Sequence, residues 1–297
     1  GHVIDAHEED DAFTHRVIEM CMVEANEAIA RLFSDLEVPL IRRTHPEPRF
    51  GDIEELRIFA RSVGASLPEE PTREDLQRLL TATAKTPAAR AAHFAVLRTL
   101  SRASYSPALV GHFALASAHY AHYTSPIRRY PDLLVHRVLQ AYLDHTENGQ
   151  NVPRGRKRRG LGRRMMDDHG VLDEGRLVEL GAHCSDTERN AEEAERSLRK
   201  FLVLQFLEEQ HLGDTFEGII TGSVASGVFV SLDRFLVEGM ARFDEIDTGS
   251  RQMDRWKSVP GTGQLVAERS GASIAVGDAV TVQIVSIDLA SRRMDVR

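Results

Sequence analysis

The spacing of hydrophobic residues divides the chain into two parts. Up to residue 212, apolar side chains recur at intervals of three and four, which predicts amphipathic helices. One short helix should end at Gly64, and the next should begin at Thr72, where Asp75 is placed for reciprocal capping. The longest early stripe consists of Val17, Ile18, Cys21, Met22, Ala25, Ala28, Ile29 and Leu32. We therefore expect a layer of helices and not a repeat array.

Two further helices are predicted before residue 212. Pro131 and Asp132 suit the first turn of one helix, because proline lacks the donor that this turn leaves unpaired and a carboxylate is favoured at the positive end of the helix dipole. The stretch "SDTE" has the spacing of a capping box that closes on Glu188. A long helix is therefore expected to begin at Ser185 and to stop at Gly213.

After Gly213 the pattern changes to short stretches of alternating apolar and polar residues, separated by Gly, Ser or Asp turns. Five or six short antiparallel strands in about 85 residues suit a small closed barrel such as an OB-fold. The predicted fold class is therefore α+β. A mainly helical domain over residues 1–212 is followed by a five-stranded antiparallel OB-fold β-barrel over residues 213–297.

Composition and charge narrow the function classes only slightly. The 297 residues carry a formal net charge of −8, which argues against indiscriminate binding to nucleic acid. No stretch approaches the roughly 20 apolar residues that span a bilayer, so we expect no membrane partner. Cys21 and Cys184 both lie in helical, partly apolar patterns. We interpret them as buried thiols in a reducing compartment, which predicts a cytoplasmic protein.

Two charged stretches have simple interpretations beside functional ones. The Gly-rich basic stretch "RGRKRRGLGRR", residues 154–164, is either a solvated loop or a loop that contacts RNA. The glutamates of the later helix are interpreted as a solvated face that pairs with arginines one turn away, although one of them could also face an active site. These glutamates are Glu188, Glu192, Glu193 and Glu195.

The stretch "YAHYTSPIRRYPDLLVHRVL", residues 120–139, gathers cations, aromatics and hydroxyls where a helix begins. The guanidinium of Arg128 is permanently charged and matches two phosphate oxygens, so it suits the charge that develops in phosphodiester hydrolysis. The alternative is that Arg128 and Arg129 form surface ion pairs with Asp132 or with glutamates. Thr124 and Ser125 could donate to phosphate or cap the helix, and the two uses are compatible.

The aromatic residues of the same stretch have two interpretations each. Tyr120, Tyr123 and Tyr130 either stack on bases or pack in the core with a satisfied hydroxyl. His119, His122 and His136 have no convincing metal-ligand spacing, so we interpret them as packing or hydrogen-bonding residues.

The longer stretch "GHFALASAHYAHYTSPIRRYPDLLVHRVL" resembles the signature of the RNB family, the RNase II and RNase R type of exoribonuclease. "HRVIEMCMVEANEAIARLF", "VPLIRRTHPEP" and "HCSDTERNAEEAERSL" resemble the flanking helices of that family, in the same order, so the resemblance covers most of residues 13–212. The stretch that opens with "GDTFEGIITGSVASGVFVSL" resembles the S-one type of OB-fold RNA-binding domain.

The resemblance implies a 3′→5′ hydrolytic exoribonuclease that degrades single-stranded RNA to nucleoside 5′-monophosphates with Mg²⁺. It implies that Arg128 is catalytic, and Arg242 stands where the family's barrel commonly has a histidine. The implied RNA-binding residues are Tyr123, Thr124, Ser125, Arg129, Phe216, Phe229 and Arg242. Whether ribosomes or other RNA-decay proteins are partners does not follow from the sequence.

The metal ligands of the family are not found in the sequence. Such enzymes hold magnesium with closely spaced aspartates in an N-terminal motif, and no such pattern occurs here. Residues 8–11 resemble instead the acidic turn before the family's next helix, and we name no metal ligand. The Mg²⁺ ligands are therefore expected in a missing N-terminal part of a longer enzyme, with little activity for this chain by itself.

Two other functions remain open on the sequence. One is a non-catalytic RNA-binding protein that retains the helical layer and the barrel after loss of the metal site. The other is a protein–protein adaptor that uses the same domains without RNA. An aspartate cluster encoded in frame before Gly1 would favour the enzyme over the non-catalytic protein.

Overall fold

The structure is a computed structural model that describes residues 12–48, 50–86, 89–155, 157–246, 255–259 and 264–297. The described residues form two compact units. One contains the described parts of residues 10–47 and 101–193, and the other contains those of residues 48–100 and 194–297. Helices and strands occur together, so the predicted mixed class is confirmed. The domain boundary predicted near residue 212 stays a prediction.

The unit that carries the central motif is mostly helical. Its core is formed by apolar side chains from several helices, among them the fully buried Phe33, Val135 and Leu161. Two short strands pair antiparallel beside these helices. The elements are α1 (Phe13–Asp35), β1 (Arg42–Thr44), β2 (Ser104–Ser106), the 3-10 helix η1 (Phe113–Leu115), α5 (Tyr130–His145), α6 (Lys157–Met165) and the first part of α7 (Glu174–Gln210).

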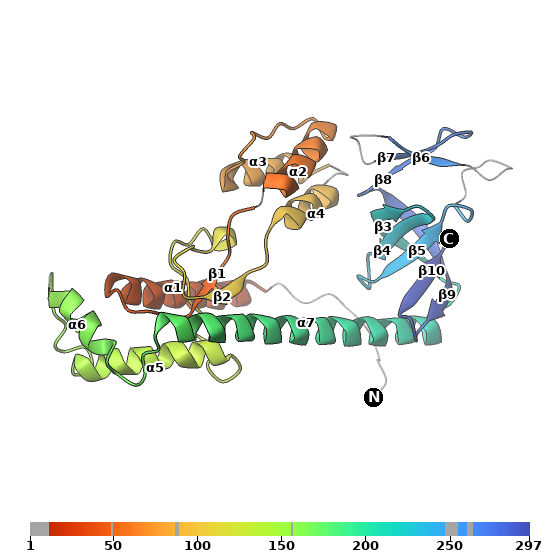
Figure 1. Cartoon of the computed structure of the whole chain (residues 1–297). Helices are drawn as coiled ribbons and strands as arrows, with labels where there is room; N and C mark the ends of the chain where they lie inside the picture. Colours follow the sequence, from red (N-terminus) through yellow and green to blue (C-terminus); the bar gives the residue numbers. More distant parts are fainter. Residues whose placement is uncertain (1–11, 49, 87–88, 156, 247–254, 260–263) are drawn as a thin grey trace. The chain divides into compact units, whose positions relative to one another are not determined.

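The long helix α7 begins earlier than the sequence pattern predicts (Figure 1). The capping box at Ser185 is wrong, because the Ser185 hydroxyl donates to the carbonyl oxygen of Gly181 at 2.7 Å, a bond to the preceding turn of the same helix. The predicted first turn of α5 is confirmed, with Pro131 at its start and Asp132 as its acidic residue.

Helix α1 does not bury the apolar stripe that the spacing predicted. The predicted residues of its first half are exposed, and those of its second half are exposed, as Ala28 is, or only partly buried, as Ile29 and Leu32 are. Ala30 and Phe33 are fully buried, whereas Phe13 and Met20 are 79% and 72% exposed. Cys21 lies in the exposed first half, so its interpretation as a buried thiol is wrong, and the same interpretation is confirmed for Cys184. The buried positions of α1, Asn26, Ala30 and Phe33, are spaced as one helical face, but that face is displaced from the predicted stripe.

Three shorter helices belong to the other unit. They are α2 (Phe50–Ser62), α3 (Arg73–Thr83) and α4 (Ala89–Thr99). The capping box at the start of α3 is confirmed, because the Thr72 hydroxyl accepts from the Asp75 N–H and the Asp75 carboxylate accepts from the Thr72 N–H at 2.8 Å. Within the described residues, no helix is long and apolar enough to cross a membrane.

Five strands close into a barrel in the C-terminal part of the chain (Figure 1). Their order around the barrel is β10-β5-β4-β3-β9. The antiparallel prediction is wrong at one seam, where β10 runs parallel to β5 with Val296 opposite Ala241. The reason is geometric, since an odd number of strands cannot alternate direction all the way round a ring. The strands are β3 (Thr215–Val224), β4 (Gly227–Leu232), β5 (Glu238–Arg242), β9 (Ala279–Asp288) and β10 (Arg293–Val296).

The end of α7 supplies part of the barrel core. Leu204 and Leu207 are fully buried in the same cluster as Val230 of β4 and Ile284 of β9. Not every strand after Gly213 joins the barrel, because three of the described strands form a separate sheet. That sheet consists of β6 (Trp256–Val259), β7 (Gln264–Ala267) and β8 (Ser273–Ala275).

Candidate nucleic-acid interface

The central motif runs as an irregular loop into α5, and a buried amide on α1 holds the loop in place. Asn26 is only 3% exposed. Its Nδ2 donates to the Tyr120 hydroxyl at 3.0 Å, and its Oδ1 accepts from the Tyr123 N–H at 2.9 Å. Both polar ends of the amide are therefore satisfied by the motif, which fixes two points of the loop.

A histidine of α5 holds the same loop from the other side. His136 Nε2 lies 2.9 Å from the carbonyl oxygen of Tyr123, and the two rings stack with centroids 4.4 Å apart. One face of the Tyr123 ring is thus covered by imidazole. Tyr120 is buried, in agreement with core packing, whereas Tyr130 is 46% exposed.

Arg129 is committed to a buried carboxylate. The side chain of Asp132 is completely buried, and its Oδ1 accepts from Arg129 Nη2 at 2.7 Å and from the Ser125 N–H at 2.8 Å. The ion-pair interpretation therefore holds for Arg129, with a buried partner instead of a surface one. Ser125 enters this contact through its backbone, which leaves its hydroxyl out of the cap.

Arg128 has a different environment from its neighbour. Its side chain is exposed, and none of the described residues forms a hydrogen bond or ion pair with it. The adjacent Ile127 is fully exposed as well. Thr124 and Ser125 are half-buried a few residues before it. The loop therefore presents the guanidinium of Arg128 to solvent, while the next residue, Arg129, is held by Asp132.

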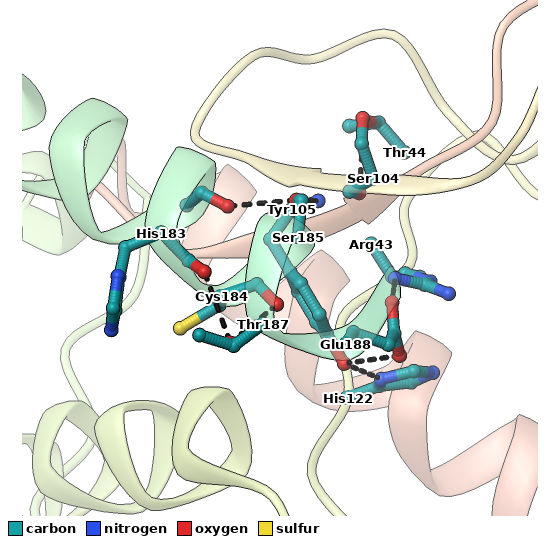
Figure 2. A network of polar contacts seen from close by, with 11 residues as sticks. Arg43, Thr44, Ser104, Tyr105, His122, His183, Cys184, Ser185, Thr187 and Glu188 are labelled. Atoms are coloured by element: carbon teal, nitrogen blue, oxygen red, sulfur yellow. Dashed lines mark hydrogen bonds and ion pairs between the residues drawn. The ribbon is translucent and has the colours of Figure 1, made fainter. Parts of the chain in front are cut away.

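A polar network joins the β1–β2 pair and α7 to the motif (Figure 2). Arg43 Nη1 of β1 lies 2.5 Å from Glu188 Oε2 of α7. The Tyr105 hydroxyl of β2 donates to Glu188 Oε1 at 3.5 Å and lies 2.9 Å from Nδ1 of His122, a residue of the motif.

Burial and nearby cations lower the pKa of two imidazoles of this region, those of His122 and His112. The pKa of His122 is lowered to about 3, chiefly by burial and then by the charges of Arg129 and Arg43. The pKa of His112 is lowered to about 4 by burial, His45 and Arg43. Burial raises the pKa of the Tyr105 hydroxyl to about 12. At neutral pH the rings of His122 and His112 are therefore uncharged, whereas the guanidinium of Arg43 stays positive.

The barrel carries a second candidate surface, a pocket in which cations lie beside the carboxylates of Glu238, Asp288 and Asp295. This pocket of about 480 Å³ includes both Phe229 and Arg242 in its lining, so the structure brings these two predicted residues together. Phe216 lies apart from them, with its ring 5.5 Å from that of Phe235 and 5.6 Å from that of His211. The other cations of the pocket are Lys200, Arg292 and Arg293.

The basic stretch 154–164 contains the helix α6 and is not simply a loop as predicted. Leu161 and Met165 are fully buried. A Cβ on Gly162 would lie 1.9 Å from the carbonyl oxygen of Leu36, so α6 packs directly on the end of α1. The pattern is therefore that of an amphipathic helix with a charged outer face. Two of its arginines form ion pairs with α1 and the turn after it, namely Arg158 with Asp35 at 3.3 Å and Arg159 with Glu37 at 3.1 Å.

Comparisons with known proteins identify the family. Residues 1–145 match the model of the RNB domain. The chain is 34% identical over 284 residues to Ribonuclease R of Escherichia coli K12, which covers 95% of this chain and 33% of that protein. It is also 34% identical over 283 residues to Ribonuclease R of Aquifex aeolicus, which covers 95% of this chain and 36% of that protein. The chain belongs to the RNB family. It spans about a third of the length of these curated relatives.

Solved structures agree with membership of the RNB family. RNase R of Mycoplasma genitalium in complex with ribose-methylated single-stranded RNA has a TM-score of 0.75 and 25% sequence identity, and the match covers 95% of this chain and 41% of that one. Yeast Ssd1, a pseudonuclease, has a TM-score of 0.60 and 19% identity over 79% of this chain and 27% of its own. The likeness to Ssd1 shows the fold alone.

The described residues of this RNB-family chain do not fit a magnesium site. Among them, no group of three or more His, Cys, Asp or Glu residues could hold a metal ion. Residues 8–11 lie outside the described residues. No chemical step is therefore assigned to a metal held by the described side chains.

Sequence reasoning missed the residues that anchor the motif. Asn26 lies four positions before Ala30 on the buried face of α1, and a lone polar residue on an apolar face was a signal that could have found it. Arg43 and Tyr105 gave no such signal, because their contacts join segments far apart in the chain. The interpretation of Glu188 as a solvated glutamate is wrong, since its side chain is 29% exposed and paired with Arg43. The same interpretation is confirmed for Glu195, which pairs with Arg199 one turn away.

Proposed function

We propose that this chain is part of a 3′→5′ hydrolytic exoribonuclease that degrades single-stranded RNA to nucleoside 5′-monophosphates. The observation that carries the proposal is the exposed, unpaired Arg128 on a loop anchored by Asn26 of α1 and Asp132 of α5. Membership of the RNB family and similarity to RNase R support the reaction class. Because the chain spans a third of those relatives, the activity is proposed for the whole protein.

In this reaction a water oxygen forms a bond to phosphorus, and the bond from phosphorus to the 3′ oxygen breaks. The shortened RNA keeps a 3′-hydroxyl, and the released nucleotide keeps its 5′-phosphate. Negative charge builds on the non-bridging oxygens, and the planar guanidinium of Arg128 can donate to two of them. A fixed cation there stabilises the transition state, so Arg128 is our proposed catalytic residue.

The residues beside Arg128 are proposed to bind the RNA strand. Arg129 contributes its positive charge while Asp132 holds its Nη2, and Thr124 and Ser125 offer hydroxyls to the backbone. Tyr123 has one ring face against His136, so only its other face or its hydroxyl is left for a base. The Mg²⁺ implied by the family needs ligands other than the described side chains.

The barrel is proposed to be an S-one type OB-fold domain that binds single-stranded RNA, with domains divided at residues 212 and 213. The ring order of its strands and the turns at residues 225–226 and 289–292, which border the pocket of Phe229 and Arg242, support this assignment. Phe229 supplies a stacking surface and Arg242 a cation. Phe216 is the weaker member of the proposed set because its ring packs on Phe235. The cytoplasmic location stays a prediction.

The test is the release of nucleoside 5′-monophosphates from 3′-extended single-stranded RNA by the full-length protein with Mg²⁺. Arg128→Ala should reduce the rate by about a hundredfold or more, the usual cost of removing one preorganised charge donor. The matched control is Arg176→Ala, which removes an exposed arginine that pairs with Glu179 on the surface of α7. Equal rates for Arg128→Ala and the native protein would refute the catalytic assignment.

The second candidate is a non-catalytic RNA-binding protein. The fold of this chain resembles that of yeast Ssd1, a pseudonuclease, and this likeness supports the second candidate. RNA binding by the full-length protein with Mg²⁺, without any release of monophosphate, would establish it in place of the exoribonuclease.

A further inference from the structure

Glu188 links three groups that surround the central motif, although it lies 83 residues from Tyr105 and 145 from Arg43. We propose that Glu188 is a positioning residue of the RNA-binding loop. Glu188 holds Arg43 and Tyr105 and, through Tyr105, fixes His122 in the loop that carries Arg128. This role rests on the proposed function. It selects Glu188 from the glutamates of α7, of which the sequence indicated only that one could face an active site.

The first contact of Glu188 immobilises Arg43. Glu188 Oε2 lies 2.5 Å from Arg43 Nη1, and the two side chains are 29% and 14% exposed. The guanidinium carbon also lies 4.7 Å from the centre of the Tyr105 ring. A cation held by a carboxylate on its edge and an aromatic ring on its face has little freedom to move.

The second contact reaches the motif through Tyr105. Glu188 Oε1 accepts from the Tyr105 hydroxyl at 3.5 Å, and the same hydroxyl lies 2.9 Å from His122 Nδ1 (Figure 2). The Tyr105 N–H donates to Ser185 Oγ at 2.9 Å, so α7 holds this residue at its backbone as well. The hydroxyl keeps its proton at neutral pH because burial raises its pKa to about 12.

The last step leads from His122 to Arg128. Burial, together with the charges of Arg129, Arg43 and Arg128, lowers the pKa of His122 to about 3. His122 also belongs to the same loop as Arg128. Movement of His122 would therefore shift the chain that presents the free guanidinium.

Because Glu188 is negatively charged, a positioning role and simple repulsion predict opposite changes in RNA affinity when the charge is removed. A carboxylate near a phosphate-binding site repels RNA, so a glutamate without a positioning role would weaken binding, and Glu188→Gln would strengthen it. A positioning role predicts the opposite result. Glu192 is the matched control, because it is exposed one turn further along α7 and Glu192→Gln removes the same charge.

The experiment measures the affinity of the 297-residue chain for a labelled single-stranded RNA oligonucleotide. Glu188→Gln should weaken binding about threefold to tenfold, the usual range for one or two hydrogen bonds, while Glu192→Gln should leave it unchanged or tighter. Tyr105→Phe should also weaken binding. The double variant Tyr105→Phe/Glu188→Gln should lose less binding free energy than the sum of the losses in the two single variants. In NMR spectra of the folded chain, Glu188→Gln should shift the ring resonances of His122, which lies against the Tyr105 hydroxyl, whereas Glu192→Gln should not.

The variants separate the failure of this role from the failure of the proposed function. If Arg128→Ala weakens binding but Glu188→Gln binds as tightly as the native chain or more tightly, the positioning role is overturned and the RNA site remains. If Arg128→Ala has no effect, the proposed function fails. If Glu188→Gln does not fold, as judged by circular dichroism, a folded Tyr105→Phe that binds normally would overturn the role.

Discussion

Removal of the buried carboxylate of Asp132 is the perturbation with the largest calculable effect. Asp132 is completely buried and accepts hydrogen bonds from the cationic Arg129 and from the Ser125 N–H. Asp132→Ala leaves the guanidinium of Arg129, which is 19% exposed, without its partner. Breaking such a buried pair costs about 3–5 kcal/mol. An independent count of two hydrogen bonds at about 1.5–3 kcal/mol each gives a similar figure.

The assay is urea unfolding followed by circular dichroism, with Asp144→Ala as the matched control. Asp144 is an exposed residue of α5 that only accepts from Gln140 Nε2 at 2.8 Å, so its loss should cost well under about 1 kcal/mol. The double variant Asp132→Leu/Arg129→Met should recover most of the loss, because replacing a whole buried pair with apolar groups is often nearly neutral. If Asp132→Ala and Asp144→Ala unfold at the same urea concentration, the anchoring of the loop by Asp132 is refuted.

Three other predictions follow from particular contacts. The pKa of His122 in the folded chain, about 3, lies below its ordinary value near 6.5. Unfolding therefore takes up a proton at pH values between about 3 and 6.5. The free energy of unfolding, measured by urea titration at several pH values, should fall as the pH is lowered through this range. The fall should be smaller in His122→Gln. Phe229→Ala should weaken RNA binding by about 1–3 kcal/mol and Phe216→Ala by less, in fluorescence anisotropy; equal effects would contradict the pocket. Gly162→Ala should destabilise the chain by about 1–3 kcal/mol, because its Cβ would meet a carbonyl oxygen at 1.9 Å, whereas Gly160→Ala, with nothing within 4 Å, should not destabilise it in thermal unfolding.

The sequence predicted the features that depend on neighbouring residues. The capping of α3 by Thr72 and the start of α5 at Pro131 require contacts within one turn, and both are present. The prediction that strands replace helices after Gly213 was also correct. Local spacing carries this information because the interacting groups are fixed by the helix or strand itself.

The errors concern contacts between distant segments. The "SDTE" pattern has the spacing of a capping box, but Ser185 bonds within α7 and to Tyr105. Cys21 lies on a periodic stripe, but its side chain is exposed in the part of the chain that the structure describes. Glu188 is indistinguishable in sequence from Glu192, and only its placement against Arg43 separates a paired carboxylate from a solvated one. Such differences depend on tertiary structure, which the spacing of residues does not encode.

The most direct test of the central claim is the salt dependence of single-stranded RNA binding by the native chain and by Arg128→Ala. Each phosphate contact to a single strand adds about −0.7 to the slope of log affinity against log salt concentration. If Arg128 meets a phosphate, Arg128→Ala should bind more weakly at low salt and its slope should be smaller by about that amount, while Arg176→Ala should change neither quantity. An Arg128→Ala chain with the affinity and the slope of the native chain would contradict the account.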